Sequence, residues 1–384
     1  MHFIGIDVAK DKHECCLLNG GDGTAITFTF ANSHNGFTEF LSRVKSRCGD
    51  EKLKVGLEST GHYTANLLSF LNAHGFEVAV FNPLSVSLHS KADSLRRTKT
   101  DKNDSRYLAQ MLMTADFKPY RKPSYHNERL KSLTRARFRL VGEIQPVKNR
   151  FRRLLQILFP EIQDFFSPLY SPTVLSLLEK LPSAKDIANA SIAKLRNILS
   201  GGRMRLDKPD ALKALAKTSV GVYDAGAAFE LKMIVQRITF FESQKTSFDT
   251  EIKTVMDELK STITSIPGIG LVLGATILAE IGDRNFETSA KLLAFAGCEP
   301  ATYQSGNYTA TKTKMVKRGS RYLRWALFLA TKAARIHNAS FNAYLKRKKS
   351  QGKHEFVALT HGMKKMVRII HAVLTKNIHY SEPF

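Results

Sequence analysis

The sequence predicts a mixed α/β N-terminal domain, a long helical middle and a mainly α-helical C-terminal domain. Short strand-like runs of β-branched and apolar residues alternate with helical patterns up to about residue 120. Two long seams of apolar residues at helical spacing lie between residues 121 and 260, and further helical patterns fill residues 261–384. A chain of 384 residues is long enough for two or three domains, each with its own core.

The N-terminal 120 residues begin with three adjacent predicted strands, at 2–9, 14–18 and 25–31. A helix at 36–47, a strand at 54–58, a helix at 63–73 and a strand at 77–81 follow, and then a helix that begins near Asp101. Three strands in a row, then helix and strand in alternation, is the order expected of a ribonuclease-H-like fold. A doubly wound fold does not begin with adjacent meandering strands.

Four acids occupy positions that this fold would bring together. Asp7 lies on the first, central strand, and Glu58 ends the neighbouring fourth strand. Asp101 and Asp104 lie three residues apart and therefore share one face of a helix start, where acids are also a common capping pattern. Converging carboxylates repel one another unless a divalent cation neutralises them, and an all-oxygen donor set suits Mg²⁺ or Mn²⁺. Such ions polarise phosphodiesters, so the four acids predict a metal-dependent site.

Composition indicates a nucleic-acid partner. The net charge is +24 and the isoelectric point is near 9.9, which favours a polyanion, with nucleic acid far ahead of an anionic membrane. No apolar run has the length of a membrane span, and the N-terminus lacks the layout of a signal peptide. The cysteines show no C-x-x-C pair or zinc-ligand spacing and are expected to be the reduced, mostly buried thiols of a cytoplasmic protein: Cys15, Cys16, Cys48 and Cys298.

The middle region contains two predicted long helices. The first starts at Asn127 as N-cap and runs to about residue 159, with one polar interruption of its apolar seam at Arg137. Pro146 is expected to kink or divide it. The second seam spans residues 231–259. The two helices either pair within one chain as an antiparallel hairpin or join chains, and basic residues on the first, including Arg150 and Arg153, are candidates to hold a nucleic-acid backbone.

The C-terminal domain opens with a glycine-rich turn before an apolar helix at 272–281. Gly268 and Gly270 in this P-G-I-G turn resemble the hairpin of a helix-hairpin-helix module, in which backbone N–H groups bind a phosphate. A helix-helix turn without such a role has the same composition. Further on, seventeen lysines and arginines but one acid lie between Lys312 and Lys376, which predicts a nucleic-acid surface.

Ser305 lies in a Ser-Gly dipeptide, which by composition is an ordinary turn. The following glycine permits close approach to a backbone, and no acid lies between Ser305 and Arg324. Cations in this stretch could clamp a phosphoryl group whose charge grows in the transition state. They are Lys314, Arg318, Arg321 and Arg324, and Lys317 beside them is a further candidate to bind nucleic acid.

The motifs G-I-D-V-A-K at 5–10, L-E-S-T-G-H-Y at 57–63 and K-T-D-K-N-D at 99–104 resemble the D-E-D-D motifs of the IS one-ten family of insertion-sequence transposases. The later pattern A-G-x-x-P, S-G and G-x-x-x-L-R is similar to the family's second block. The resemblance covers nearly the whole chain. One departure is Cys298, where the family often has leucine or valine, and we expect it to matter only for packing.

The resemblance implies a fold and a mechanism. The N-terminal domain would be similar to the RuvC resolvase, Asp7, Glu58, Asp101 and Asp104 would hold Mg²⁺ or Mn²⁺, and Ser305 would form a phosphoserine link to DNA. A serine hydroxyl needs an activating base or metal, so the hypothesis is a composite centre that joins these acids to Ser305.

The resemblance also implies partners and a location. A non-coding bridge RNA would pair with donor and target DNA, the protein would act as a homo-oligomer (a dimer or tetramer), and it would work in the bacterial cytoplasm at the nucleoid. Two rival interpretations are a structure-specific endonuclease that activates water with the four acids, and a nucleic-acid-binding protein with an inert ribonuclease-H-like domain.

Overall fold

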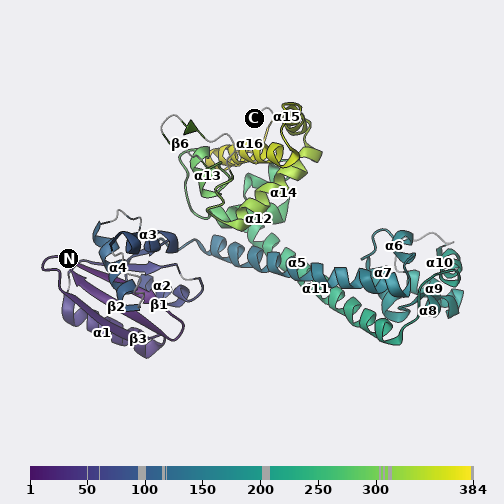
Figure 1. Cartoon of the computed structure of the whole chain (residues 1–384), viewed down its shortest axis with the longest axis horizontal. Helices are drawn as coiled ribbons and strands as arrows, with labels where there is room; N and C mark the ends of the chain where they lie inside the picture. Colours follow the sequence, from purple (N-terminus) through teal and green to yellow (C-terminus); the bar gives the residue numbers. More distant parts are fainter. Residues whose placement is uncertain are drawn as a thin grey trace. The chain divides into compact units, whose positions relative to one another are not determined.

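The structure is a computed structural model, which describes all residues except 50, 60, 94–100, 115–116, 118, 201–207, 302–303, 306–307, 310–313 and 382–384. Two compact units make up the chain, Met1–Lys122 and Pro123–Phe384 (Figure 1). The first is a mixed α/β unit and the second is mostly helical. None of the helices in the described part combines the length and the apolar character that a membrane crossing requires.

A five-stranded sheet forms the centre of the first unit. Its strands are β1 (His2–Val8), β2 (Lys12–Asn19), β3 (Ala25–Ala31), β4 (Leu53–Glu58) and β5 (Glu77–Phe81), in the spatial order β3-β2-β1-β4-β5. β1 pairs antiparallel with β2 and parallel with β4, β2 pairs antiparallel with β3, and β4 pairs parallel with β5. The five strands predicted from the sequence are therefore confirmed, and β1 is the central strand.

Helices cover both faces of the sheet. α1 (His34–Cys48) and α2 (Thr64–Ala73) pack on one face, over a core that includes Ile4, Ile6, Val55 and Leu57. α3 (Pro83–Asp93) and α4 (Asp101–Thr114) pack on the other face, against Phe3, Cys16 and Phe81 (Figure 1). The helix predicted to begin near Asp101 is confirmed, whereas α3 was not predicted because no apolar periodicity marks it.

Two long helices form the framework of the second unit. α5 (Tyr125–Leu158) and α11 (Ala225–Leu259) pack along each other, and ion pairs joining Arg129 to Glu251 and Arg150 to Glu230 show that they run antiparallel. Of the two pairings predicted for these helices, the one within a single chain is thus present. Arg137, which interrupts the apolar seam of α5, pairs with Asp249 of α11. The Arg137 guanidinium donates hydrogen bonds to the Asp249 carboxylate.

Shorter helices pack at the two ends of this pair and create two separate cores (Figure 1). At one end lie α6 (Ile162–Phe165), α7 (Pro172–Lys180), α8 (Ala184–Asn189), α9 (Ile192–Leu199) and α10 (Lys208–Lys217). At the other lie the 3₁₀ helix η1 (Thr262–Ser265), α12 (Leu271–Ile281), α13 (Ser289–Phe295), α14 (Arg321–His337), α15 (Ala339–Ser350) and α16 (Glu355–Lys376). A two-stranded hairpin, β6 (Gln304–Ser305) and β7 (Tyr308–Thr309), completes the unit.

The predicted start of the first long helix was wrong. Asn127 lies inside α5, which begins at Tyr125 after Ser124. The carboxylate of Asp283 accounts for the difference, because Ser124 N donates to Oδ2 at 2.6 Å and Asn127 Nδ2 donates to Oδ1 at 2.7 Å. Asn127 is therefore a donor to Asp283 rather than the N-cap acceptor, and Ser124 takes the N-cap position.

Pro146 does not divide α5, which runs unbroken from Tyr125 to Leu158. A proline inside a helix removes one backbone hydrogen bond and crowds the preceding turn. Ile144 and Val147, on either side of Pro146, are buried, so the packing of α5 outweighs the local cost.

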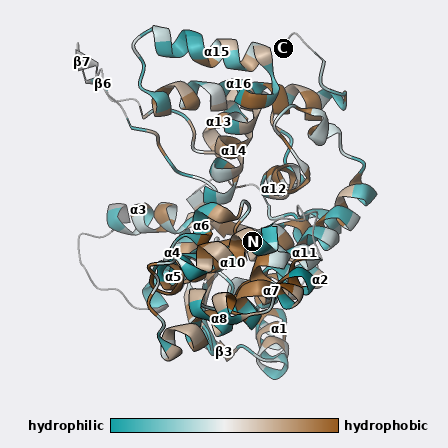
Figure 2. Ribbon diagram, turned by 90° about the vertical axis from the view of Figure 1, so that its right-hand side faces the viewer, coloured by the Kyte–Doolittle hydropathy of each residue, from teal (hydrophilic) through white to brown (hydrophobic). Residues whose placement is uncertain are grey.

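The C-terminal helices differ in hydropathy. α12 is hydrophobic along most of its length, whereas α15 is mainly hydrophilic (Figure 2).

Candidate active site and nucleic-acid interface

Asp7 and Glu58 are neighbours at the ends of two parallel strands. The register pairs Gly5 with Gly56 and Ile6 with Leu57, so Asp7 and Glu58 occupy the next positions. Adjacent strands lie about 4.8 Å apart. Both acids are half-buried. Their side chains project to the face covered by α4, because residues two apart on a strand share a face and Gly5 and Gly56 both abut α4.

The absence of a side chain at Gly5 brings α4 onto β1. A Cβ at Gly5 would lie 2.0 Å from the backbone oxygen of Ser105 and 2.4 Å from the backbone nitrogen of Ala109. Ser105 is fully buried there, and Asp104 immediately precedes it. Asp101 is the first residue of α4, and its side chain lies outside the described part. The backbone therefore places the start of α4 beside the strand that carries Asp7.

The donor chemistry of this face fits a hard divalent cation. Asp7, Glu58 and Asp104 offer carboxylate oxygens only, which suits Mg²⁺ or Mn²⁺. Among the described side chains, which exclude that of Asp101, no group of three or more histidines, cysteines or acids is close enough to hold a metal ion. Asp7 and Asp104 each have an interaction partner within the protein.

A fifth acid, Glu14, lies directly opposite Asp7 on β2. The sequence pattern places Glu14 in a predicted strand and predicts no role in a site for it. Its position beside Asp7 depends on the β1–β2 register, which no local pattern in the sequence marks. The residue type alone could have marked Glu14, because burying a charged carboxylate in a strand costs free energy unless the carboxylate is paired or bound to a metal.

Ser305 ends β6, one strand of the short hairpin, and faces Tyr308 of β7 in the register. The side chain of Ser305 lies outside the described part, as do residues 306–307 that connect the strands. At the base of the hairpin, Ala301 N donates to Lys314 O at 2.8 Å and Val316 N donates to Glu299 O at 3.0 Å. Ser305 thus lies at the end of β6, beyond this paired base of the hairpin.

Two glycines lock the base of this ribbon. A Cβ at Gly297 would lie 2.2 Å from Arg318 O, and a Cβ at Gly319 would lie 2.3 Å from Phe295 O. Both glycines have positive φ angles, 64° and 129°, which other residues rarely adopt. The A-G-x-x-P and G-x-x-x-L-R patterns therefore correspond to two interlocking turns, one after α13 and one before α14.

The predicted clamp residues and Lys317 fall into two groups. Lys314, Lys317, Arg318 and Arg321 are exposed on or beside the ribbon. Arg324 is half-buried, and its Nη1 donates to Gly319 O at 2.9 Å and to Ala296 O at 3.3 Å. Its guanidinium therefore braces the two turns, whereas the exposed four are available to an anion.

The predicted helix-hairpin-helix glycines have different surroundings. Gly268 has a φ angle of +87° and packs on α14, where a Cβ would lie 2.4 Å from Ala334 N. Gly270 is exposed and caps α12 without a side-chain hydrogen bond. The close backbone approach at Gly268 is thus to a helix of the same unit, and Gly270 is the position open to a ligand.

Basic residues outside the ribbon are also exposed. Arg150 and Arg153 lie on the outer side of α5, and Arg150 pairs with Glu230 at 3.5 Å. On α15, Lys346 and Arg347 are exposed and have no acidic partner among the described residues. Glu355, the one acid between Lys312 and Lys376, pairs with Arg335 at 2.5 Å and Lys349 at 2.7 Å.

All four cysteines are buried and free, as predicted. Cys298 is fully buried in the core of the C-terminal helices, and burial raises its pKa to about 11 despite the nearby charge of Arg324. A protonated, enclosed thiol at this position serves packing.

Comparison with known proteins identifies the chain as a transposase. A family model for IS110 transposases with DEDD acids, described as "Transposase", matches residues 4–160. A second, "Transposase IS116/IS110/IS902 family", matches residues 260–346. The first match contains Asp7, Glu58, Asp101 and Asp104, and the second contains Ser305. The chain belongs to the IS110 (IS one-ten) family of insertion-sequence transposases.

Curated relatives are similar over nearly their whole length. The insertion element IS116 44.8 kDa protein of Streptomyces clavuligerus is 25% identical over 97% of this chain and 94% of its own. The mini-circle putative transposase for IS117 of Streptomyces coelicolor is 25% identical over 99% of this chain and 95% of its own. The pilin gene-inverting protein of Moraxella bovis is 23% identical, over 98% and 96% respectively.

Proposed function

We propose that the first unit is a RuvC-like catalytic domain of the ribonuclease-H class. The strand order β3-β2-β1-β4-β5, with three antiparallel strands followed by two parallel additions, supports this assignment. The family supports an enzyme that cleaves and rejoins DNA. The observation that carries the proposal is that Asp7, Glu58 and the start of α4 share one face of the sheet.

In this proposal, Asp7, Glu58, Asp101 and Asp104 hold Mg²⁺ or Mn²⁺. When bound, the ion supplies charge that polarises a phosphodiester and stabilises the departing oxygen. The rigid pairing of β1 with β4 fixes the separation of Asp7 and Glu58, and α4, seated on Gly5, brings the other two acids. The acids thus orient the phosphate and offer a base for the nucleophile's proton.

Ser305 is the proposed nucleophile. Its Oγ gives up a proton and bonds to the phosphorus, the bond to one ester oxygen breaks, and the released oxygen takes up a proton. The result is a phosphoserine link, which the reverse attack by a DNA hydroxyl resolves into a rejoined strand. The exposed cations Lys314, Lys317, Arg318 and Arg321 would stabilise the charge on the phosphoryl oxygens, and Arg324 would hold the ribbon in place.

The proposed partners are donor DNA, target DNA and a non-coding bridge RNA that selects both, with the protein acting as a dimer or tetramer in the cytoplasm. Charge supports polyanionic partners for the second unit. Residues 123–384 contain forty-two lysines and arginines and twenty-one acids, whereas residues 1–122 contain sixteen and thirteen. The name of the pilin gene-inverting relative, which describes a DNA rearrangement, supports recombination.

The test is a cleavage reaction on donor and target DNA with the element's own non-coding RNA and Mg²⁺, stopped with SDS and analysed before and after protease. We expect a DNA species whose slow migration is lost on protease treatment and which Ser305→Ala does not form. Ser243→Ala is the matched control, since Ser243 is exposed on α11 and its Oγ donates only to Phe240 O. Free cut ends with Ser305→Ala would instead show a carboxylate nuclease that activates water.

A further inference from the structure

Large apolar side chains are exposed where the end of α14 meets the start of α16. Ile336 is 75% exposed, Phe356 is 63% exposed and Val357 is 47% exposed. An ion pair between Arg335 and Glu355 at 2.5 Å joins the two helix ends. Contiguous exposed apolar side chains, unlike scattered ones, are typical of binding surfaces. We call this surface the α14–α16 patch, which consists of Phe328, Ile336, His354, Phe356 and Val357.

Three rings of the α14–α16 patch lie in nearly parallel planes. The centroid of the Phe356 ring is 6.5 Å from that of Phe328 and 5.7 Å from that of His354, with interplanar angles of 14° and 21°. Phe328 is half-buried against the core of the C-terminal helices, whereas Phe356 and His354 are exposed. Phe356 N donates to His354 Nδ1 at 3.3 Å, which holds these two residues together. The patch therefore presents ordered aromatic rings to solvent, on which a planar group can stack.

The surroundings of the α14–α16 patch are positively charged. Lys332, one turn after Phe328 on the same face of α14, is exposed, and its Nζ lies 5.8 Å from the Phe328 ring centroid. Glu355, the one acid in residues 312–376, also pairs with Lys349 at 2.7 Å. A second copy of the chain would bring its own seventeen cations of this stretch against these, so charge opposes self-association here. The complementary partner is a polyanion that carries planar groups.

We propose that the α14–α16 patch binds the unpaired bases of a DNA strand, which stack on its rings while Lys332 contacts a phosphate. Such stacking tolerates any sequence, because every base has a flat face. The family supports an enzyme that cleaves and rejoins DNA, and strands that leave one duplex for another pass through an unpaired state. The proposal rests on the proposed function only in taking DNA as the partner. The metal site and Ser305 have no part in it.

The test measures binding of the full chain to a fluorescent single-stranded oligothymidylate, without Mg²⁺ or RNA, at a salt concentration that screens backbone contacts. We expect Phe356→Ala to raise Kd about fivefold or more without changing the unfolding midpoint. Phe356→Tyr keeps a ring and should keep the affinity, whereas Phe356→Leu, with apolar bulk but no ring, should resemble Phe356→Ala. Phe229→Ala is the matched control and should leave Kd unchanged, because Phe229 is 64% exposed on α11.

An oligomer with abasic sugars separates base stacking from phosphate contacts, since it keeps every phosphate. We expect it to bind the unchanged protein more weakly and to be insensitive to Phe356→Ala. Equal weakening of the abasic oligomer or of a duplex by Phe356→Ala would show a backbone contact and overturn the proposal, as would an unchanged Kd for oligothymidylate. A loss seen with oligouridylate but not with oligothymidylate would assign the patch to RNA and overturn it too. These results would leave the proposed function standing, which fails instead if the unchanged chain binds no DNA.

Discussion

At the residue scale, Gly5 decides how closely α4 can approach β1. Any side chain at Gly5 would collide with the backbone of α4, 2.0 Å from Ser105 O, and backbone atoms cannot turn aside as a flexible side chain can. We expect Gly5→Ala to push α4 away from β1, to lower the free energy of unfolding of the first unit by about 1–3 kcal/mol, and to reduce Mn²⁺ affinity. Thermal unfolding and Mn²⁺ titration measure the two effects.

Gly142→Ala is the control for this prediction, because nothing lies within 4 Å of a Cβ at Gly142 and the residue is exposed within α5. Its alanine should stabilise the helix by roughly 0.5–1 kcal/mol and leave Mn²⁺ binding unchanged. Unaltered Mn²⁺ affinity in Gly5→Ala would mean that the seating of α4 on β1 does not govern the site.

Arg324 supplies a second prediction at this scale. Its guanidinium donates to the carbonyls of Gly319 and Ala296 and so ties together the two turns at the base of the Ser305 hairpin. Arg324→Met keeps the apolar stem and removes the donors, so we expect a loss of about 1–3 kcal/mol in stability. Formation of the protease-sensitive DNA species should fall more than DNA affinity does. An equal fall in both would make Arg324 a DNA contact rather than a positioning residue.

At the element scale, one ion pair joins α5 to α12. Glu280 is almost fully buried on α12, and its carboxylate accepts hydrogen bonds from Arg135 Nε at 2.7 Å and Nη2 at 2.9 Å. Burial alone would raise the pKa of Glu280, but the hydrogen bonds from Arg135 and Ser320 outweigh it and lower the pKa below 4.5. The contact also reaches the start of α14, because Ser320 caps that helix.

A lowered carboxyl pKa makes stability depend on pH in a fixed direction. The contribution of Glu280 is complete above the unfolded pKa, near 4.5, and is lost as the pH falls through the lower folded value. We expect Glu280→Gln to cost about 1–3 kcal/mol at neutral pH and to lose less stability than the unchanged protein as the pH falls below about 4.5. Parallel curves of unfolding midpoint against pH would contradict this account.

The elements also show what the sequence can predict. Strands, the two long helices and the start of α4 follow from local periodicity, and Asp7, Glu58 and Asp104 could therefore be placed on them. The N-cap predicted at Asn127 was wrong because the Asn127 side chain donates to Asp283, a residue from another part of the chain. Glu14 was missed for a related reason: its partner is set by strand register, and local patterns do not reveal register.

At the scale of the whole molecule, charge is divided unequally between the units. The unit with the four acids is close to neutral, whereas residues 123–384 carry an excess of twenty-one positive charges. Such a division suits a protein in which the second unit binds the nucleic-acid backbone while the first holds a cation. The composition predicted the polyanionic partner, but only the structure shows that Glu355 neutralises Lys349 and leaves Lys346 and Arg347 to solvent.

This distribution predicts how DNA affinity responds to salt. Each phosphate contact contributes about 0.9 to the slope of log affinity against log salt concentration, because the cation displaces a counterion. Lys346→Gln with Arg347→Gln, both on α15, should therefore reduce the slope by about 2 without changing the unfolding midpoint. Binding of a fluorescent DNA duplex to the full chain at several salt concentrations gives the slope.

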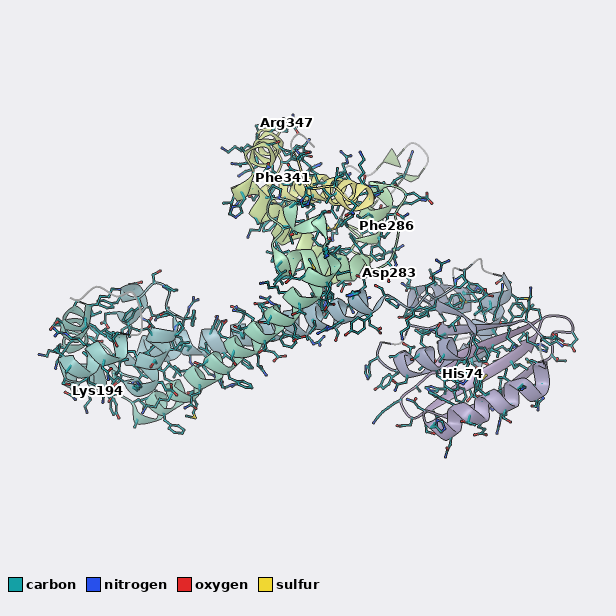
Figure 3. The ribbon with its side chains drawn as sticks, turned by 180° about the vertical axis from the view of Figure 1, so that it is seen from behind. His74, Lys194, Asp283, Phe286, Phe341 and Arg347 are labelled. Carbon is teal, nitrogen blue, oxygen red and sulfur yellow. The ribbon has the colours of Figure 1, made fainter. Side chains whose placement is uncertain are left out.

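The control removes two exposed lysines near the other end of the helix pair, Lys180 on α7 and Lys194 on α9, so that net charge falls equally (Figure 3 labels Lys194 and Arg347). If α15 contacts the backbone, Lys180→Gln with Lys194→Gln leaves the slope nearly unchanged, because an uncontacted charge acts only through the screened long-range field. Equal slopes in the two double variants would show that net charge, rather than the α15 surface, governs binding. A lower slope in the α15 variant alone would place DNA phosphates along that helix.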